Sequence, residues 1–153
     1  MRNILVLGAT GNFGRRISIA LAKKNIPSIL SARNRSELTI LTCQIKKKYP
    51  ESIAQSEVID IKKNLFEALS TKKPFVVINA CGPYKKDDFS VAKACISLGI
   101  HYIDLADNRD YINEIKTLDS VAKAKNVSII VGASTVPTLS SAVFEHFQNQ
   151  FLK

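Results

Sequence analysis

The sequence of 153 residues predicts an α/β domain, a doubly wound parallel sheet of about six strands with helices on both faces. Three observations predict this fold class. Short apolar segments alternate with longer segments whose apolar residues recur at helical spacing. The connections are short, without a repeat or linker, which favours parallel strands joined by right-handed crossovers. Some of the short segments are continuously apolar, as strands buried on both faces are.

The expected strands are short segments rich in apolar and β-branched residues. They lie at residues 4–7, 27–33, 54–61, 74–81, 100–106 and 127–134. The first and the fourth are continuous apolar runs, so we expect both of their faces to be buried. Ligands of such sheets bind outside the carboxyl ends of the strands, and the residues that follow each strand are therefore the candidates for function.

The expected helices fill the segments between the strands and follow the last one. They lie at residues 17–25, 34–50, 62–72, 87–99, 108–126 and 138–153. The second places Leu38, Leu41 and Ile45 on one face, which should be buried. The fourth has Asp87 and Asp88 in its expected first turn, where acidic side chains suit the helix dipole.

Composition excludes several classes of protein. Hydrophobic residues make up 46% of the chain, yet no apolar stretch approaches the roughly 18 residues that span a bilayer, and the N-terminus lacks a signal-peptide pattern. We therefore expect a cytoplasmic protein with no membrane partner. Cys43, Cys81 and Cys95 are odd in number, and with only His101 and His146 they form no metal-ligand spacing. Reduced thiols and no metal are expected.

The formal net charge of +9 raises the question of nucleic acid. The lysines occur in pairs and triplets, mostly at expected helix ends and in connections, where solvated lysine is ordinary. They form no single basic stripe with interleaved aromatic residues. We expect no nucleic-acid partner, and a small molecule instead.

The segment "ILVLGATGNFGRR" places Gly8, Gly11 and Gly14 between the first strand and the first helix. Gly8 and Gly11 allow backbone angles and close approaches that a Cβ would block, and Gly14 allows the helix to pack tightly on the strand. Such a turn directs helix N-terminal N–H groups at an anion. The arrangement is that of a dinucleotide-binding turn, although the spacing is G-x-x-G-x-x-G rather than G-x-G-x-x-G.

The end of the second strand indicates which dinucleotide is bound. An NAD site has an acidic residue there, about 20 residues beyond the glycines, and an NADP site has a cation. Arg33 lies 19 positions beyond Gly14, and no acidic residue occurs in residues 28–36. Its planar guanidinium can pair bidentately with a phosphate, with Arg35 or Ser36 as a second contact. The sequence therefore favours NADP over NAD, the alternative being a solvated arginine near a helix start.

Two further strand ends supply candidate cofactor contacts. Asp60 could accept a hydrogen bond from the adenine amino group while Ile61 covers the ring, or Asp60 could cap a helix. Gly82 and Pro83 form a tight turn near the expected pyrophosphate and nicotinamide ribose, and Tyr84 could line the nicotinamide pocket.

No catalytic acid or base stands out. Tyr84, His101, Asp104 and Asp107 are candidates by position alone: His101 is more simply a hydrogen-bonded core histidine, and the two aspartates face a substrate or cap a helix. Cys81 is interpreted as a small buried filler. The hydroxyls of "GASTVPTLSS", residues 132–141, are possible nicotinamide or substrate contacts. The Tyr-x-x-x-Lys pair of short-chain dehydrogenases is absent from the sequence.

The glycine turn, "SARNRSEL", "VVINACGPY", "VAKACISLGIHYIDLAD" and "GASTVPTLSS", in this order, resemble the NADP-binding Rossmann domain of saccharopine dehydrogenase-like oxidoreductases. The resemblance covers nearly the whole chain and implies NADP as cofactor. By position it implies that the glycine turn binds pyrophosphate, Arg33 the 2′-phosphate, and Gly82 and Pro83 the nicotinamide side. The residues expected to bind the cofactor are Gly8, Thr10, Gly11, Asn12, Phe13, Gly14, Arg33, Asp60, Ile61, Ala80, Gly82, Pro83 and Tyr84.

The resemblance also implies a second α/β domain that supplies most of the substrate pocket and a possible homodimer contact. We expect residues 1–153 to be the cofactor domain alone, inactive by itself, and either a part of a longer enzyme or a stand-alone cofactor-binding module. A part of a longer enzyme should expose apolar surface where the second domain would pack. Its last helix places Phe144, Phe147 and Phe151 on one side. The expected reaction is hydride transfer to or from a carbon–nitrogen or similarly polarised bond of a small metabolite. The alternative is a cofactor-sensing module of the atypical short-chain type, without turnover.

Overall fold

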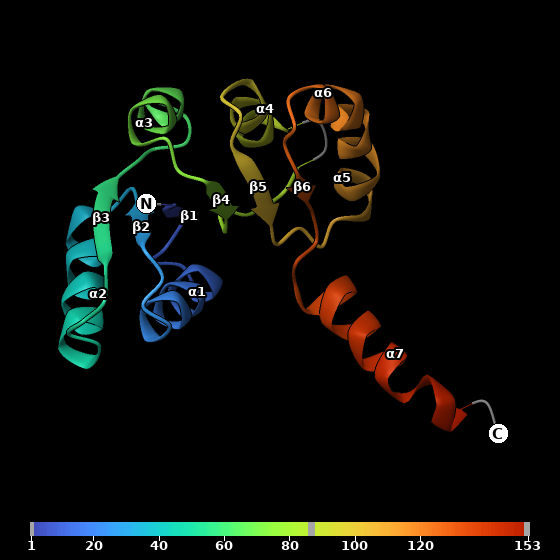
Figure 1. Cartoon of the computed structure of the whole chain (residues 1–153), viewed down its shortest axis with the longest axis horizontal. Helices are drawn as coiled ribbons and strands as arrows, with labels where there is room; N and C mark the ends of the chain where they lie inside the picture. Colours follow the sequence, from blue (N-terminus) through green and yellow to red (C-terminus); the bar gives the residue numbers. More distant parts are fainter. Residues whose placement is uncertain (1, 86–87, 152–153) are drawn as a thin grey trace.

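The computed structural model describes residues 2–85 and 88–151, which form one sheet of six parallel strands with helices on both faces (Figure 1). The strands are β1 (Ile4–Leu7), β2 (Ser28–Ala32), β3 (Ala54–Val58), β4 (Val76–Asn79), β5 (His101–Asp104) and β6 (Ile129–Ile130). Their order is β3-β2-β1-β4-β5-β6. The chain winds outward from β1 to β3 and then returns to place β4 on the other side of β1. The expected fold class is confirmed.

Seven α-helices lie in the described residues, two of them on one face of the sheet (Figure 1). They are α1 (Asn12–Lys23), α2 (Arg35–Lys48), α3 (Leu65–Lys72), α4 (Ser90–Ser97), α5 (Arg109–Glu114), α6 (Asp119–Ala124) and α7 (Ser140–Phe151). Helices α1 and α2 cover β1 to β3 on one face, and α3, α4 and α5 cover the other. Helix α7 extends away from the sheet. Of Pro137, Asn149 and Phe151 only the backbone is described.

The core divides at the sheet because successive side chains of a strand point to opposite faces. In β1, Leu5 and Leu7 pack with α3 and α4, whereas Val6 packs with α1 and α2. Leu38 and Leu41 are buried in the second cluster together with Ile45, as the helical spacing predicts.

The expected burial of both faces of β4 is wrong in part. Val77 is buried, but Val76 and Ile78 are only half-buried. They point to the face that α1 and α2 cover further along the sheet, and these two helices do not extend over β4 to β6 (Figure 1). On this face Ile130 of β6 is exposed.

The helix expected at 108–126 is interrupted. Its residues form α5, a 3₁₀ turn at Ile115–Leu118 and α6. Tyr111 and Ile115 pack into the main core, whereas Ala122 packs into a separate apolar cluster. Since the two sets of apolar residues face different clusters, the 3₁₀ turn redirects the chain between them.

The strand expected at 127–134 and the helix expected at 87–99 are both shorter in the structure. The ladder of β6 ends at Ile130, because Gly132, at φ +72°, turns the chain so that its N–H reaches the Asp104 carboxylate. Helix α4 begins at Ser90, and Asp88 precedes it, accepting a hydrogen bond from the Ser90 hydroxyl at 2.8 Å. Asp88 is therefore not in the first turn, and Asp87 lies outside the described residues.

Candidate cofactor site

The glycine turn leads directly from β1 into α1. Gly8 adopts φ +74°, a left-handed conformation that favours glycine, and the N–H of Ala9 donates to the carbonyl of Ser31 at 2.8 Å. Gly11 is the N-cap of α1 and has no side chain to satisfy the first N–H groups, and no other side chain of the described residues caps them. The helix therefore presents N–H donors and the positive end of its dipole to an anion.

Backbone packing around the turn leaves no room for side chains at two of the glycines. A Cβ added to Gly14 would lie 2.1 Å from the carbonyl oxygen of Gly8, so α1 touches the turn with its backbone. A Cβ on Gly8 would lie 2.9 Å from the Sγ of Cys81, which follows β4. The glycines thus bring the start of α1 and the ends of β1 and β4 together.

A cavity of about 450 Å³ lies above this turn, at the carboxyl ends of β1 to β4. Its size is that of a small-molecule or cofactor pocket. Of the residues expected to bind a cofactor, those that line it are Gly8, Thr10, Gly11, Arg33, Asp60, Ile61, Ala80, Gly82 and Pro83. Four of the strand ends that sequence reasoning selected separately therefore border one space.

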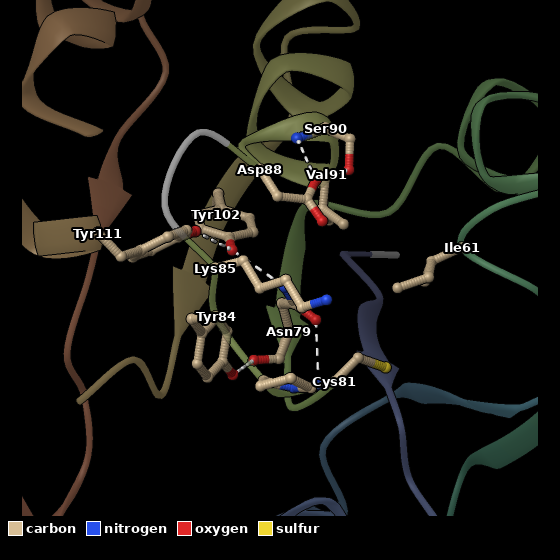
Figure 2. A pocket seen from close by; sticks show the side chains of 11 residues that line it. Ile61, Asn79, Cys81, Tyr84, Lys85, Asp88, Ser90, Val91, Tyr102 and Tyr111 are labelled. Atoms are coloured by element: carbon tan, nitrogen blue, oxygen red, sulfur yellow. Dashed lines mark hydrogen bonds between the residues drawn. The ribbon is translucent and has the colours of Figure 1, made fainter. Parts of the chain in front are cut away.

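Four expected cofactor residues do not line this cavity. Asn12 and Phe13 are exposed in the first turn of α1, and Gly14 is buried beneath the glycine turn. Their side chains contribute nothing to the cavity wall, which leaves their backbone N–H groups as the possible contacts. Tyr84 lines a smaller adjoining cavity of about 30 Å³, which shares residues such as Cys81 with the larger one (Figure 2).

The chain of this structure matches the family model for the saccharopine dehydrogenase NADP-binding domain over residues 4–130. The chain belongs to this family. It is thus an NADP-binding domain of the oxidoreductase type, and the expected cofactor, NADP, is confirmed at the level of the family. No curated protein sequence matches the chain.

Solved structures with the same fold include NADPH-dependent enzymes. YwfH, an NADPH-dependent reductase involved in bacilysin biosynthesis, is 17% identical with a TM-score of 0.67, over 85% of this chain and 75% of that one. A short-chain dehydrogenase from Sphingobium yanoikuyae in complex with NADPH is 11% identical (TM-score 0.62; 86% and 70% covered). The leucoanthocyanidin reductase–NADPH complex of Vitis vinifera is 17% identical with a TM-score of 0.57, over 84% of this chain and 48% of that one. These identities support the fold alone. No helix in the described residues is long and apolar enough to cross a membrane.

Other side chains that line the NADP-domain cavity were not among the expected cofactor residues. They include Lys62, Cys81, Lys85 and Asp88. Lys62 and Lys85 belong to lysine pairs that look in the sequence like ordinary solvated side chains. The one feature that could have identified them as cavity residues is their position just beyond a strand end. Together with Arg33 they give the lining of the cavity three cationic side chains, against the two acidic side chains of Asp60 and Asp88.

Cys81, interpreted from the sequence as a buried filler, is half-buried, lines the cavity and packs its Sγ close to Gly8. Burial raises the pKa of Cys81 above its ordinary 9.0, and the positive charge of Arg33 opposes part of this rise. The guanidinium at the end of β2 and the thiol at the end of β4 therefore interact electrostatically across the end of β1.

Asp60 caps its own turn rather than a helix. Its carboxylate accepts from the N–H of Lys62 at 3.0 Å, and its own N–H donates to the side chain of Asn64 at 2.8 Å. Asn64 is the N-cap residue of α3, so the helix-cap alternative for Asp60 is wrong. Asp60 lines the cavity next to Ile61, where an adenine contact stays a prediction.

The four candidates for a catalytic acid or base lie in different surroundings. Tyr84 donates its hydroxyl proton to the carbonyl of Asn79 at 2.7 Å, and burial raises its pKa. His101 begins β5, at the amino end of the sheet and away from the cavity, and its Nδ1 accepts from the N–H of Ser128 at 3.0 Å. Asp107 is exposed and does not line the cavity.

Asp104 is fully buried, so the expectation that it faces a substrate is wrong. The helix-cap alternative is wrong as well, because Asn108 caps α5 by accepting from the N–H of Tyr111. The Asp104 carboxylate instead accepts from the N–H groups of Ala106 and Gly132 and from the Tyr111 hydroxyl. The segment 132–141 is held to this point by Gly132 and does not line the large cavity.

Proposed function

We propose that this domain binds NADP(H) in the cavity at the carboxyl ends of β1 to β4 and orients it for hydride transfer to or from a small metabolite. The observation that carries the proposal is one continuous cavity bordered by the uncapped N-terminus of α1 and by the Arg33 side chain. The first suits a pyrophosphate and the second a 2′-phosphate.

The residues of the cavity fit the three parts of the cofactor. Gly8 and Gly11 leave the backbone open to a close phosphate approach, and the backbone N–H groups of Asn12 and Phe13 are the expected donors. Ile61 and Asp60 suit an adenine ring. Ala80, Gly82 and Pro83 line the β4 side, where we place the nicotinamide ribose.

When bound, the nicotinamide supplies or accepts the hydride, and the chain supplies grip and orientation. We propose a carbon–nitrogen or similarly polarised bond as the reacting group, which family membership supports. Tyr84 keeps its proton over a wide pH range, since burial raises its pKa, and it lines the cavity that adjoins the β4 side. It is thus a neutral residue of the cavity wall rather than a base, and its one proton is donated to the carbonyl of Asn79.

A second domain would complete the substrate pocket and could also form a dimer contact. Two exposed apolar surfaces support this: the side chains of Leu139, Val143, Phe144 and Phe147 at α7, and the half-exposed face of β4 to β6. We propose that a further domain of the protein covers α7. Dye binding to exposed apolar surface should fall when Phe144 and Phe147 are both changed to Gln in this chain, and it should be low in a longer chain that carries the second domain.

Calorimetric titration with NADPH and with NADH, at one salt concentration, tests the cofactor proposal. Arg33→Glu should weaken the binding of NADPH about 10- to 100-fold, the range that a hydrogen bond to a charged group contributes. It should change the binding of NADH little. Arg109→Glu makes the same charge change at the exposed start of α5 and serves as the control. Arg35→Glu tests the second phosphate contact.

Equal loss of both cofactors in Arg33→Glu would contradict the role of Arg33. Binding of neither cofactor by the unaltered chain would contradict the proposed site as a whole.

A further inference from the structure

Four buried polar side chains form a continuous hydrogen-bonded chain beside the β4 end of the cofactor cavity. Asn79 of β4, Tyr102 and Asp104 of β5 and Tyr111 of α5 have exposed fractions of 4%, 1%, 0% and 2%. The Asn79 amide nitrogen lies 3.1 Å from the Tyr102 hydroxyl, which lies 3.3 Å from the Tyr111 hydroxyl. The Tyr111 hydroxyl lies 3.0 Å from a carboxylate oxygen of Asp104. Figure 2 shows the links from Tyr111 to Cys81.

Each hydrogen bond in this chain can have only one donor and one acceptor, so its direction is fixed. The Asp104 carboxylate only accepts, so Tyr111 donates to it. The oxygen of Tyr111 is then the acceptor for Tyr102, and the oxygen of Tyr102 is the acceptor for the amide NH₂ of Asn79. The carboxylate therefore sets the direction of all three hydrogen bonds, which polarise one another.

The other end of the chain is a wall of the cofactor cavity. With its NH₂ directed at Tyr102, Asn79 turns its amide oxygen to the backbone N–H of Cys81, which donates to it at 3.1 Å. Cys81 and its neighbours Ala80 and Gly82 line the cavity, and the Sγ of Cys81 packs close to Gly8 of the glycine turn. The orientation of one buried amide thus holds the β4 side of the site in place.

The Asp104 end is anchored independently. One carboxylate oxygen accepts from Ala106 at 3.1 Å and from Gly132 at 3.0 Å, which ties it to the segments that follow β5 and β6. The chain therefore connects two regions at the carboxyl edge of the sheet that share no local sequence.

We propose that Asp104 is a positioning residue for NADP binding, acting through Tyr111, Tyr102 and Asn79 on the backbone of Cys81. Asp104 does not line the cavity. It acts by fixing which group donates and which accepts in each hydrogen bond of the chain. This inference rests on the proposed cofactor site at the ends of β1 to β4.

Asp104→Asn tests the direction of the chain. The new side chain keeps an oxygen for Ala106 and Gly132 and presents an NH₂ group to Tyr111. Tyr111 must then donate to Tyr102, and Tyr102 to Asn79, whose amide turns over and sets its NH₂ against the N–H of Cys81. We expect amide hydrogen exchange at Cys81, followed by NMR without cofactor, to accelerate at least about tenfold, and NADPH to bind about fivefold more weakly, the factor of one neutral hydrogen bond.

Tyr102→Phe provides the second variant, because it removes no charge and only the hydroxyl that joins the Asn79 amide to the Tyr111 hydroxyl by hydrogen bonds. Alone it frees the Asn79 amide and should accelerate exchange at Cys81. In its background, Asp104→Asn should add nothing to exchange at Cys81 or to NADPH affinity. Asp110→Asn removes an exposed charge from the first turn of α5 and should change neither quantity.

Two results would overturn the inference. One is Asp104→Asn altering only the unfolding temperature, as expected for a carboxylate that merely anchors its own turn. The other is an equal effect of Asp104→Asn on Cys81 exchange and NADPH affinity with and without the Tyr102 hydroxyl. If the Asp104→Asn variant does not fold, an unchanged rate of Cys81 exchange in Tyr102→Phe contradicts the inference. Failure of the unaltered chain to bind NADPH would instead contradict the proposed function, since exchange at Cys81 is measured without cofactor.

Discussion

Gly14 lies in the first helix, where alanine ordinarily stabilises by up to about 1 kcal/mol relative to glycine. Here we predict the opposite sign for Gly14→Ala. The added Cβ would lie 2.1 Å from the carbonyl oxygen of Gly8, where real Cβ contacts are essentially never below 3.0 Å, so α1 must retreat by about 0.9 Å. Such overpacking costs about 1–3 kcal/mol. The shift also stretches the 3.0 Å hydrogen bond from Gly11 to Gly8, which is worth about 1 kcal/mol.

These terms give a net loss of about 1–3 kcal/mol in the free energy of unfolding, or a fall in Tm of about 2–4 °C per kcal/mol for a domain of this size. Thermal and urea unfolding followed by circular dichroism measure it. Because the shift moves the N-terminus of α1, NADPH should also bind more weakly. Gly99→Ala is the control: Gly99 has φ +69° with no atom within 4 Å of an added Cβ, so it should lose stability through backbone strain and keep its NADPH affinity. A Gly14→Ala variant as stable as the unaltered chain would refute the reasoning.

Three further predictions concern titration and capping. Iodoacetamide at about pH 8 should label the exposed Cys43 first and Cys81 more slowly, because burial raises the pKa of Cys81. Cys95 should be labelled only on unfolding, since burial raises its pKa to about 12. NADPH should slow the labelling of Cys81 alone, and mass spectrometry of the labelled peptides measures all three rates. Burial raises the pKa of Tyr102 above 10.0, so above that pH the folded chain keeps a proton that the unfolded chain releases. The contribution of Tyr102 to the free energy of unfolding is therefore complete below about pH 10 and should fall as the pH rises further. The urea midpoint measured as a function of pH checks this. Asn108→Ala removes the cap of α5 and should cost about 1 kcal/mol in the same assay.

The sequence predicts the features that local pattern determines. Apolar runs identify β1 and β4, and the alternation of strands and helices gives a parallel sheet with its ligand edge. The glycine spacing and Arg33 select two borders of one cavity, because both lie directly beyond a strand end. These properties depend on neighbouring residues, so one sequence is enough to detect them.

Other features depend on contacts between distant segments. The carboxylate of Asp104 meets the N–H of Gly132, 28 residues away, and Asn79 meets Tyr102, 23 residues away. No periodicity or capping pattern signals either bond, and in the sequence Asp104 therefore resembles a substrate contact or a helix cap. The break between α5 and α6 has the same origin, because it follows from two separate apolar clusters.

The central claim is that the chain binds NADP(H) where the glycine turn, the end of β2 and the end of β4 meet. NMR titration of the ¹⁵N-labelled chain with NADPH tests it directly. The account predicts saturable amide shifts at Gly8, Gly11, Arg33 and Gly82, with little change at Ser128 on the amino side of the sheet. Saturable shifts confined to the α5, α6 and β6 side, or no saturable shift at the glycine turn, would contradict it.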